Sequence, residues 1–385
     1  MDHDDRVHLV SLSGVLRSST SARIKGLKLL DAVAGRALMA GVRPSEPTAT
    51  PIASGAIGRI LVIRPGGIGD AVLAIPFLRE LKRVFPAAAL DVLAERRNCE
   101  IFSSLPGIVD RCDSVDEGPW RCRRRLRRAS YDLVFDTEQW HHLSAFLAAV
   151  SGARIRVGFD TNRRRNRCYT VLVPYRHEDF EGESFLRMLS AVTGRQVRVN
   201  WDAPFLELQE THRRWAERQL PNERVVALAL RGGIRERCWE PEKFQALIPR
   251  LLERELDVCL LGGRGDATLA AALRKPFPAA RVVDLTGKTS LLQSAAVLSR
   301  SRLFIGTDAG LMHLAYAVGT PVVALFGAGI EAKWAPRGAR HRVLNRHLPC
   351  SPCTQFGYTP RCPIGVRCLR EISVDAVGQA ALRQA

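Results

Sequence analysis

Short apolar runs rich in Val, Ile and Leu recur along the chain and are separated by helix-like segments. Residues 59–63 read RILVI, and ALDVLA (89–94) and YDLVF (131–135) follow with helical patterns between them. The same rhythm restarts at residue 224 with RVVALAL, after which four further runs of this kind follow. Alternation of strands and helices is typical of a parallel sheet covered by helices on both faces. The sequence therefore predicts an α/β protein with two doubly wound parallel-sheet domains.

The strand rhythm is interrupted between residues 199 and 221, where Pro, Trp and a charged helix occur. The 385 residues are enough for two domains of roughly 150 residues each. We expect an N-terminal extension over 1–55, a first domain over 56–200 and a second domain over 201–385. In such sheets ligands bind beyond the carboxyl ends of the strands, so we expect the site in a cleft between the two domains.

The predicted N-terminal extension contains Ser, Pro, Thr and Gly clusters around one helical pattern, ARIKGLKLLDAVAGRALMAG (22–41). Its apolar positions alternate with Lys25, Lys28 and Arg36, so the predicted helix is basic and amphipathic. We expect the remainder of the extension to be partly disordered. Such a helix either lies on a membrane surface or docks on the first domain.

The balance of charged residues is strongly basic, with a net charge of +18. This charge favours anionic partners without choosing among nucleic acid, phosphorylated sugars and an anionic membrane. No apolar run approaches the ~20 residues needed to span a bilayer, and the first residues are acidic where a signal peptide is basic. We therefore expect a cytoplasmic protein.

The loop after the first predicted strand is rich in glycine and contains one acid, in the sequence RPGGIGDA (64–71). Gly66, Gly67 and Gly69 do not make the dinucleotide fingerprint or a P-loop. Two interpretations of Asp70 are open at this point. It either caps the following helix or acts as a general base at the end of the strand.

A second loop of interest lies in the second predicted domain, within RLFIGTDAGLMHLAYAVGTPVVALFG (302–327). This segment reads as a strand, a tight turn and a helix, with Asp308 near the cap and Ala309 and Gly310 in the first turn. The unpaired N–H groups of a helix N-terminus bind anions, and glycine allows a pyrophosphate to approach closely. His313 lies one turn further on, where it either contacts the same ligand or is simply packed.

Several blocks of this sequence, in order, resemble glycosyltransferase family 9, the bacterial heptosyltransferases of lipopolysaccharide core assembly. The resemblance covers roughly residues 57 to 375. The blocks are RILVIRPGGIGDAVLAIPFLRELKRVFP, RCWEPEKF, LLGGRGD, the long segment around GTDAGLMH and a terminal group of cysteines.

The resemblance implies a GT-B fold, in which two Rossmann-like domains bind the acceptor and the nucleotide sugar, respectively. It also implies inversion without a required metal, with Asp70 as the general base and Gly66 and Gly67 on the acceptor side. An Asp-x-Asp metal motif occurs only at Asp2 and Asp4. We therefore expect activity without any cofactor.

The residues expected around the donor depart from the family pattern. Arg237 stands where the family usually has Lys, Asp266 where it has Glu, and Ala309 where it has Ser or Thr. Gly232 and Gly233 replace hydroxyl-bearing phosphate ligands. Arg keeps the positive charge and adds bidentate geometry. The expected donor is ADP-heptose, and another nucleotide sugar is the alternative.

Two basic runs fall in the predicted acceptor domain, RCRRRLRR (121–128) and NRRRNR (162–167). They are either solvated surface or a docking site for an anionic glycolipid acceptor and the inner-membrane surface. For docking we single out Arg123, Arg124 and Arg125. The expected location is then peripheral, at the cytoplasmic face of the inner membrane.

Four cysteines cluster near the end of the chain: Cys350, Cys353, Cys362 and Cys368. A Cys-x2-Cys pair followed by two more thiols is compatible with one structural zinc ion, an oxidised pair or reduced thiols. We prefer a structural site, with zinc as the candidate metal.

Two other classes of function compete with a glycosyltransferase. A nucleic-acid-binding protein would account for the basic charge, but the basic runs lack interleaved aromatic residues and no recognition motif occurs, so no nucleic acid is expected. A non-catalytic protein that binds nucleotide sugars would not need Asp70 opposite a phosphate site.

Overall fold

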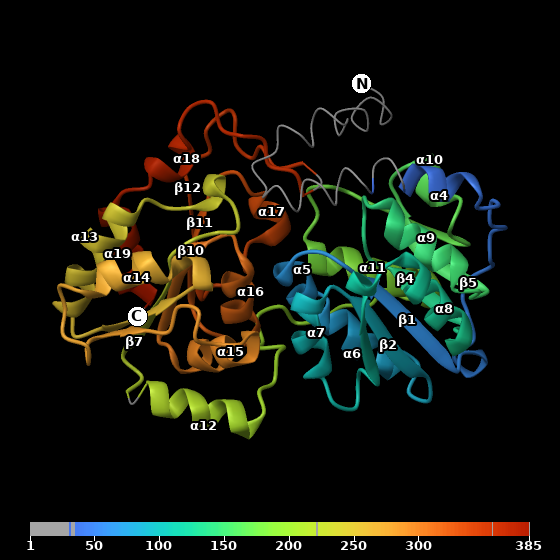
Figure 1. Ribbon diagram of the computed structural model, residues 1–385, viewed down its shortest axis with the longest axis horizontal. Coiled ribbons are helices and arrows are strands. Elements are labelled where there is room, and N and C mark those ends of the chain that lie inside the picture. The colour runs from blue at the N-terminus through green and yellow to red at the C-terminus, as the bar shows by residue number, and fades with distance from the viewer. Residues whose placement is uncertain (1–30, 32–34, 221, 356, 385) are drawn as a thin grey trace. The chain divides into compact units, whose positions relative to one another are not determined.

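The computed structural model describes residues 31, 35–220, 222–355 and 357–384. The chain divides into two compact units, the first ending at Val199 and the second beginning at Asn200. Each unit contains one six-stranded sheet in which every strand pair is parallel (Figure 1). The predicted α/β class with two parallel-sheet domains is confirmed.

The sheet of unit 1 has the strand order β3-β2-β1-β4-β5-β6. The order reverses between β1 and β4, where Val62 of β1 pairs with Val92 on one side and Phe135 on the other. Because all strands are parallel, their carboxyl ends form one edge, where ligands of such sheets bind. The strands are β1 (Arg59–Arg64), β2 (Ala89–Ala94), β3 (Arg111–Ser114), β4 (Leu133–Asp136), β5 (Ile155–Asp160) and β6 (Val171–Pro174).

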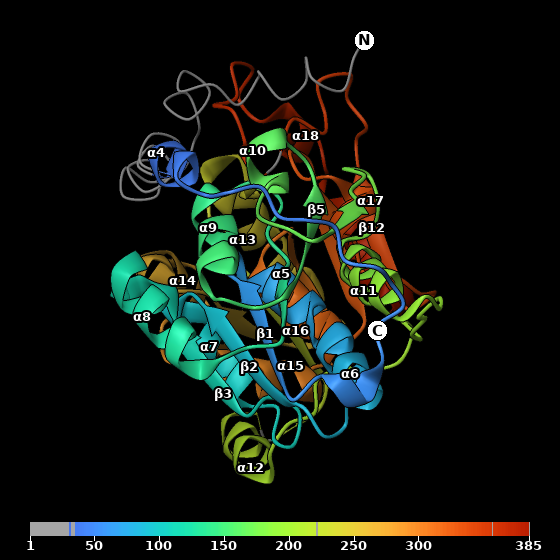
Figure 2. The same cartoon turned by 90° about the vertical axis from the view of Figure 1, so that its right-hand side faces the viewer.

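Helices cover both faces of this sheet, with α8 and α9 on one face and α6 and α11 on the other (Figure 2). On the α8 side, Leu61 and Ile63 pack against Leu126 in one apolar core. On the α6 side, the Phe77 ring lies 5.3 Å from that of Phe135. The helices are α4 (Arg36–Ala40), η2 (Ser54–Ala56), α5 (Ile68–Leu73), α6 (Ile75–Val84), α7 (Arg96–Ser103), η3 (Val115–Glu117), α8 (Pro119–Ala129), α9 (His142–Val150), α10 (Arg163–Asn166) and α11 (Glu181–Thr193).

The end of the predicted N-terminal helix docks on unit 1. Met39 of α4 is buried, with its sulfur 3.8 Å from that of Cys168. The Asp31 carboxylate accepts hydrogen bonds from the backbone N–H groups of His142 and Leu143 at the start of α9. The docked interpretation therefore holds for this end, while residues 22–30 and 32–34 lie outside the described part.

Unit 2 has the strand order β12-β11-β10-β7-β8-β9. Trp239 is fully buried in its core and donates from Nε1 to the carbonyl of Ile372, which fixes the segment before the last helix. The strands are β7 (Val225–Ala229), β8 (Asp257–Leu261), β9 (Val282–Asp284), β10 (Leu303–Thr307), β11 (Val322–Phe326) and β12 (His341–Asn345). The helices are α12 (Glu210–Gln219), η4 (Arg235–Arg237), α13 (Pro241–Leu252), η5 (Arg264–Asp266), α14 (Ala267–Arg274), α15 (Leu291–Arg300), α16 (Gly310–Ala317), α17 (Glu331–Trp334), α18 (Arg367–Arg370) and α19 (Val374–Gln384). Within the described part of the chain, no helix is both long and apolar enough to cross a membrane.

The second basic run is not uniformly a surface feature, which corrects its interpretation as solvated loop or docking site. Arg163 and Arg164 are exposed, but Arg165 is fully buried. The Arg165 guanidinium lies 3.1 Å from the Asp136 carboxylate at the end of β4 and 2.7 Å from the Tyr169 hydroxyl. This arginine therefore joins the loop after β5 to the carboxyl edge of the sheet.

Replacing Arg165 should destabilise unit 1 strongly, because the buried Asp136 charge would lose its partner. We expect Arg165→Ala to lower the free energy of unfolding by about 3–5 kcal/mol. The exposed neighbour provides the control, and Arg164→Ala should change it by no more than about 0.5 kcal/mol. Urea unfolding followed by tryptophan fluorescence measures the free energy of unfolding of both variants. Equal decreases would contradict the assignment of Arg165 as the buried partner of Asp136.

Candidate active site

The glycine-rich loop of unit 1 joins the end of β1 to the start of α5 at the carboxyl edge of the sheet. Gly66 has a φ of +108°, and a Cβ there would lie 2.9 Å from the Arg64 guanidinium. Its N–H donates to the Glu95 carboxylate at 3.0 Å, and its carbonyl accepts from the Asn98 amide at 2.7 Å. The loop is therefore fixed to α7, in a conformation that favours glycine.

Asp70 is the third residue of α5 and is not its N-cap, which is Gly67. The capping interpretation of Asp70 is therefore wrong. The Asp70 side chain is 23% exposed, and its Oδ2 atom lies 3.9 Å from Nη2 of Arg64. A carboxylate that is partly open to solvent at this edge can accept a proton from a bound hydroxyl group.

Arg64 lies behind Asp70 and is fully buried, and sequence reasoning did not identify it. It donates to the Pro65 carbonyl at 2.8 Å, to the Thr137 carbonyl at 2.9 Å and to the Glu138 carboxylate at 3.1 Å. Burial alone would lower the pKa of Arg64, but the nearby carboxylates of Glu138 and Asp70 raise it above its ordinary value. Arg64 is therefore a permanent cation that joins the glycine-rich loop to the end of β4.

Glu138 completes this buried charge arrangement. Its Oε1 atom accepts hydrogen bonds from the backbone N–H groups of Gln139 and Trp140, at 3.0 and 3.1 Å. Burial alone would raise the pKa of Glu138, but His141, Arg64 and Arg165 hold it far below its ordinary value. The group is thus an anion that fixes the position of Arg64.

In unit 2, the residues predicted at the phosphate site form an ion pair. Asp308 follows β10 directly and is buried, with its Oδ2 atom 3.0 Å from Nη1 of Arg237. The ring of His313, which is also buried, lies 3.8 Å from the same carboxylate through Nε2. Burial alone would raise the pKa of Asp308, but Arg237 and His313 lower it below its ordinary value. The structure thus brings these three predicted residues together.

The guanidinium of Arg237 is held on several sides and is still 20% exposed. It lies over the Trp334 ring at 5.4 Å and within 3.4 Å of the Thr354 hydroxyl, two partners that sequence reasoning missed. A Cβ at Gly232 would lie 2.5 Å from the Arg237 carbonyl, so glycine is needed for this close approach, whereas Gly233 faces open space.

The turn before α16 leaves the start of that helix without a side-chain cap. Its N-cap is Ala309, and Gly310 is the first helical residue, so Asp308 is not the cap. The first N–H groups of a helix have no partner within the helix and attract anions. The start of α16 and Arg237 together therefore make a cationic half-site at the carboxyl edge of unit 2.

Asp266 lies apart from this ion pair and is used within its own loop. Its Oδ2 atom accepts from the Gly263 N–H at 2.9 Å, and Arg231 lies 3.7 Å from its Oδ1 atom. Because β8 and β10 flank β7, Asp266 and Asp308 share one edge, with their strands about 10 Å apart. A ribose at Asp266 and a diphosphate at Arg237 stay predictions that fit this spacing.

The cysteine block supports the Arg237 loop. The buried Glu236 carboxylate accepts from the Cys362 N–H at 3.1 Å, and Thr354, which follows Cys353, contacts Arg237. Burial and the neighbouring Cys368, Cys362 and Cys350 raise the pKa of the Cys353 thiol to about 11. No group of three or more His, Cys, Asp or Glu side chains among the described residues could hold a metal ion. A structural metal site at these four cysteines therefore stays a prediction.

Two Rossmann-like domains, one with a glycine-rich acidic loop and the other with a cationic half-site, define a glycosyltransferase of the GT-B class. The chain belongs to glycosyltransferase family 9 (heptosyltransferase), whose family model matches residues 119–359. The predicted family, and with it the prediction of an enzyme, is confirmed.

The relatives agree with this assignment along most of the chain. Lipopolysaccharide heptosyltransferase 3 of Escherichia coli is 28% identical over 286 residues, which cover 70% of this chain and 83% of that protein. The solved family 9 glycosyltransferase of Veillonella parvula has a TM-score of 0.74 at 19% identity and covers 88% of this chain and 99% of that one. E. coli heptosyltransferase WaaC, solved with ADP-2-deoxy-2-fluoro heptose, has a TM-score of 0.64 at 19% identity, with coverage of 85% and 100%.

Arg237 should account for much of the anion affinity of unit 2. We expect Arg237→Ala to weaken the binding of inorganic pyrophosphate by roughly 10- to 100-fold, because a charge-assisted hydrogen bond is lost. Arg235 lies exposed in the same loop, so Arg235→Ala should change the affinity by less than about twofold if only local contacts matter. Isothermal titration measures the pyrophosphate affinity of both variants. An equal loss of affinity in the two would show that net charge, and not the position of Arg237, determines binding.

Proposed function

We propose that this protein is an inverting, metal-independent glycosyltransferase that transfers heptose from ADP-heptose to a lipopolysaccharide core or a related glycan, with Asp70 as the general base. The observation that carries this proposal is the position of Asp70, partly exposed at the carboxyl edge of unit 1 and backed by the buried Arg64. The names of the relatives support the sugar and the acceptor, since one is a lipopolysaccharide heptosyltransferase and another was solved with an ADP-heptose analogue.

In the proposed reaction, the Asp70 carboxylate takes the proton of an acceptor hydroxyl group. The acceptor oxygen forms a bond to the anomeric carbon of the donor while the bond from that carbon to the diphosphate oxygen breaks on the opposite face. The configuration is therefore inverted, and ADP leaves with the bonding electron pair. Arg237 and the N–H groups at the start of α16 neutralise the charge that develops on the diphosphate.

In each unit, a neighbouring charged side chain holds the proposed functional residue in position. Arg64 keeps the Asp70 side chain and the glycine-rich loop in place, so that little reorganisation is needed when the acceptor binds. Asp308 does the same for Arg237, because its carboxylate fixes one side of the guanidinium and leaves the other side for the diphosphate. We place Gly66 and Gly67 beside the acceptor, where the absence of side chains gives it room.

The acceptor we propose is an anionic glycolipid, so the enzyme would work as a peripheral protein at the cytoplasmic face of the inner membrane. The basic charge of the chain supports this location. The nucleoside of the donor is proposed from the relatives and not from this sequence, because Asp266, Gly232 and Gly233 depart from the family pattern.

The variant Asp70→Asn tests the proposed base. We expect kcat to fall by roughly 10²- to 10⁴-fold, the usual contribution of a general base, while the affinity for ADP stays within about twofold of the native value because the donor binds unit 2. Radiolabelled or coupled transfer assays with ADP-heptose give kcat, and titration with ADP gives the affinity. If another nucleoside diphosphate bound tightly in place of ADP, Asp70 would remain the proposed general base, but the donor would be a different nucleotide sugar. A native rate in the variant would exclude Asp70 as the base.

Removal of divalent metals should leave the reaction intact. With Arg237 and a helix N-terminus to stabilise the leaving group, we expect at least about 80% of the native rate in excess EDTA, since no metal is needed as the Lewis acid. The assay compares initial rates before and after dialysis against EDTA, with Mg²⁺ added back as the control. Loss of turnover that Mg²⁺ restores would contradict the proposal.

A further inference from the structure

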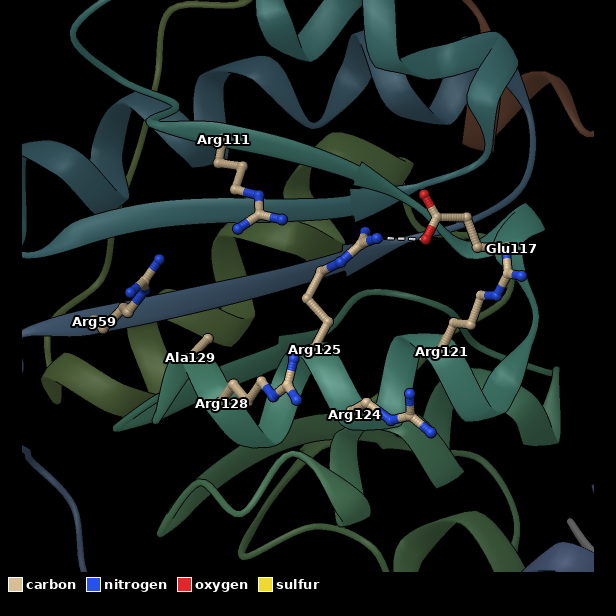
Figure 3. Close-up of a pocket in the computed structure, with 8 residues that line it drawn as sticks. All are labelled: Arg59, Arg111, Glu117, Arg121, Arg124, Arg125, Arg128 and Ala129. Atoms are coloured by element: carbon tan, nitrogen blue, oxygen red, sulfur yellow. Dashed lines mark hydrogen bonds and ion pairs between the residues drawn. The ribbon is translucent and has the colours of Figure 1, made fainter.

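A groove lined almost entirely by arginine runs along α8 on unit 1. Its lining residues are Arg59, Arg111, Glu117, Arg121, Arg124, Arg125, Arg128 and Ala129, and its volume is about 560 Å³. Figure 3 shows Arg125 of α8 reaching toward Glu117, while Arg111 extends from β3 on the other side of the groove. None of the proposed catalytic or donor residues contributes to it.

The strand register explains why charged side chains gather here. Asp91 of β2 pairs with Arg111 of β3, and Leu93 pairs with Asp113, so Arg111 and Asp113 lie on the same face as the α8-side core. The Arg59 guanidinium binds the buried Asp91 carboxylate at 2.8 Å. Arg125 lies 3.0 Å from Asp113 and also pairs with Glu117. These pairs form the floor of the groove.

Three arginines of the groove are left without such compensation. Among the described residues, no carboxylate lies within ion-pair distance of Arg121, Arg124 or Arg128. All three are exposed, and they lie on one side of α8, whose opposite side buries Cys122 and Leu126. An excess of three fixed cations in a concave surface attracts a ligand that carries several negative charges, such as phosphate groups.

The Arg59 end of the groove is distant from the proposed catalytic loop, whereas Glu117 at the other end lies just beyond the carboxyl end of β3. Arg59 is the first residue of β1, whereas Asp70 follows the last, Arg64. Five steps along a strand span about 17 Å, so this end of the groove lies well away from the carboxyl edge where the acceptor hydroxyl would react. A ligand held at the Arg59 end would orient the protein and would not take part in the transfer.

A lipid surface fits this feature better than a soluble phosphate or a nucleic acid. Trp120, at the start of α8, has 61% of its surface exposed, and the Arg123 guanidinium lies 5.9 Å from its ring centre. Exposed tryptophan beside arginine is typical of helices that lie at the boundary between headgroups and acyl chains. A groove built for a soluble anion would not need this apolar side chain.

We propose that the exposed face of α8, formed by Trp120, Arg121, Arg123, Arg124 and Arg128, docks the enzyme on a membrane rich in anionic phospholipid. The inference rests on the proposed function only in that a lipid-linked acceptor gives docking a purpose. It replaces the sequence-based selection of Arg125, which the structure shows to be neutralised by Asp113 and Glu117.

The test measures co-sedimentation of the full chain with vesicles of 30% phosphatidylglycerol in phosphatidylcholine, at low salt and without donor. The triple variant Arg121→Ser/Arg124→Ser/Arg128→Ser should bind roughly 100-fold more weakly, given the usual contribution of basic residues at an anionic surface. The matched control removes the same charge from a second arginine-lined pocket on unit 2, with Arg224→Ser/Arg254→Ser/Arg302→Ser. This control should bind within about threefold of the native chain.

Two further measurements make the outcome specific. Trp120→Ala should weaken vesicle binding several-fold without altering the net charge, and circular dichroism confirms that each variant is folded.

Equal losses of vesicle binding in the two triple variants, or native binding to pure phosphatidylcholine, would overturn the proposal. The proposal would also be overturned if millimolar inorganic pyrophosphate, or duplex DNA, released the protein from the vesicles at a concentration lower than that of the lipid. Asp70→Asn should bind vesicles as the native chain does, so failure of the proposed catalysis is distinguishable from failure of docking.

Discussion

The geometry of the proposed catalytic half depends on one buried cation, Arg64. Its guanidinium has given up water, a transfer that costs several kcal/mol unless each donor finds an acceptor and the charge finds a partner. Here the Pro65 and Thr137 carbonyls and the Glu138 carboxylate supply them. Because these acceptors belong to the loop after β1 and the segment after β4, satisfying Arg64 fixes these two segments relative to one another. The position of Asp70, 3.9 Å away, follows from that arrangement.

The second half uses the same principle with the signs exchanged. There the buried group is the Asp308 carboxylate, and its partner Arg237 reaches solvent. An anion next to a diphosphate would oppose binding if it stood alone. Paired with Arg237, it instead holds the cation in one orientation and lowers the entropy that binding must remove. The Cys362 backbone and Thr354 hold the same loop from the other side, which gives the C-terminal segment a structural part in this half-site.

Much of the fold could be predicted because its signals are local. RILVI and RVVALAL predict strands from composition and length alone, and the helices between them follow from periodicity. Asp70 and Asp308 could be selected because each lies in a glycine-containing turn directly after a strand. The partners that define their chemistry could not be selected in this way. Glu138 lies 74 residues after Arg64 in the chain, and Thr354 lies 117 residues after Arg237. No local pattern carries such pairings, because only the folded chain brings those distant segments together.

The arginine runs show the same limit for charge. Arg163, Arg164 and Arg165 are identical in the sequence, yet two are exposed and the third is buried beside Asp136. In α8, Arg125 is neutralised by Asp113 and Glu117, whereas Arg121, Arg124 and Arg128 have no carboxylate partner among the described residues. Net charge therefore predicts that an anion binds but not where it binds. The place is decided by which cations the fold has already paired, because only an uncompensated cation gains free energy from a new anion.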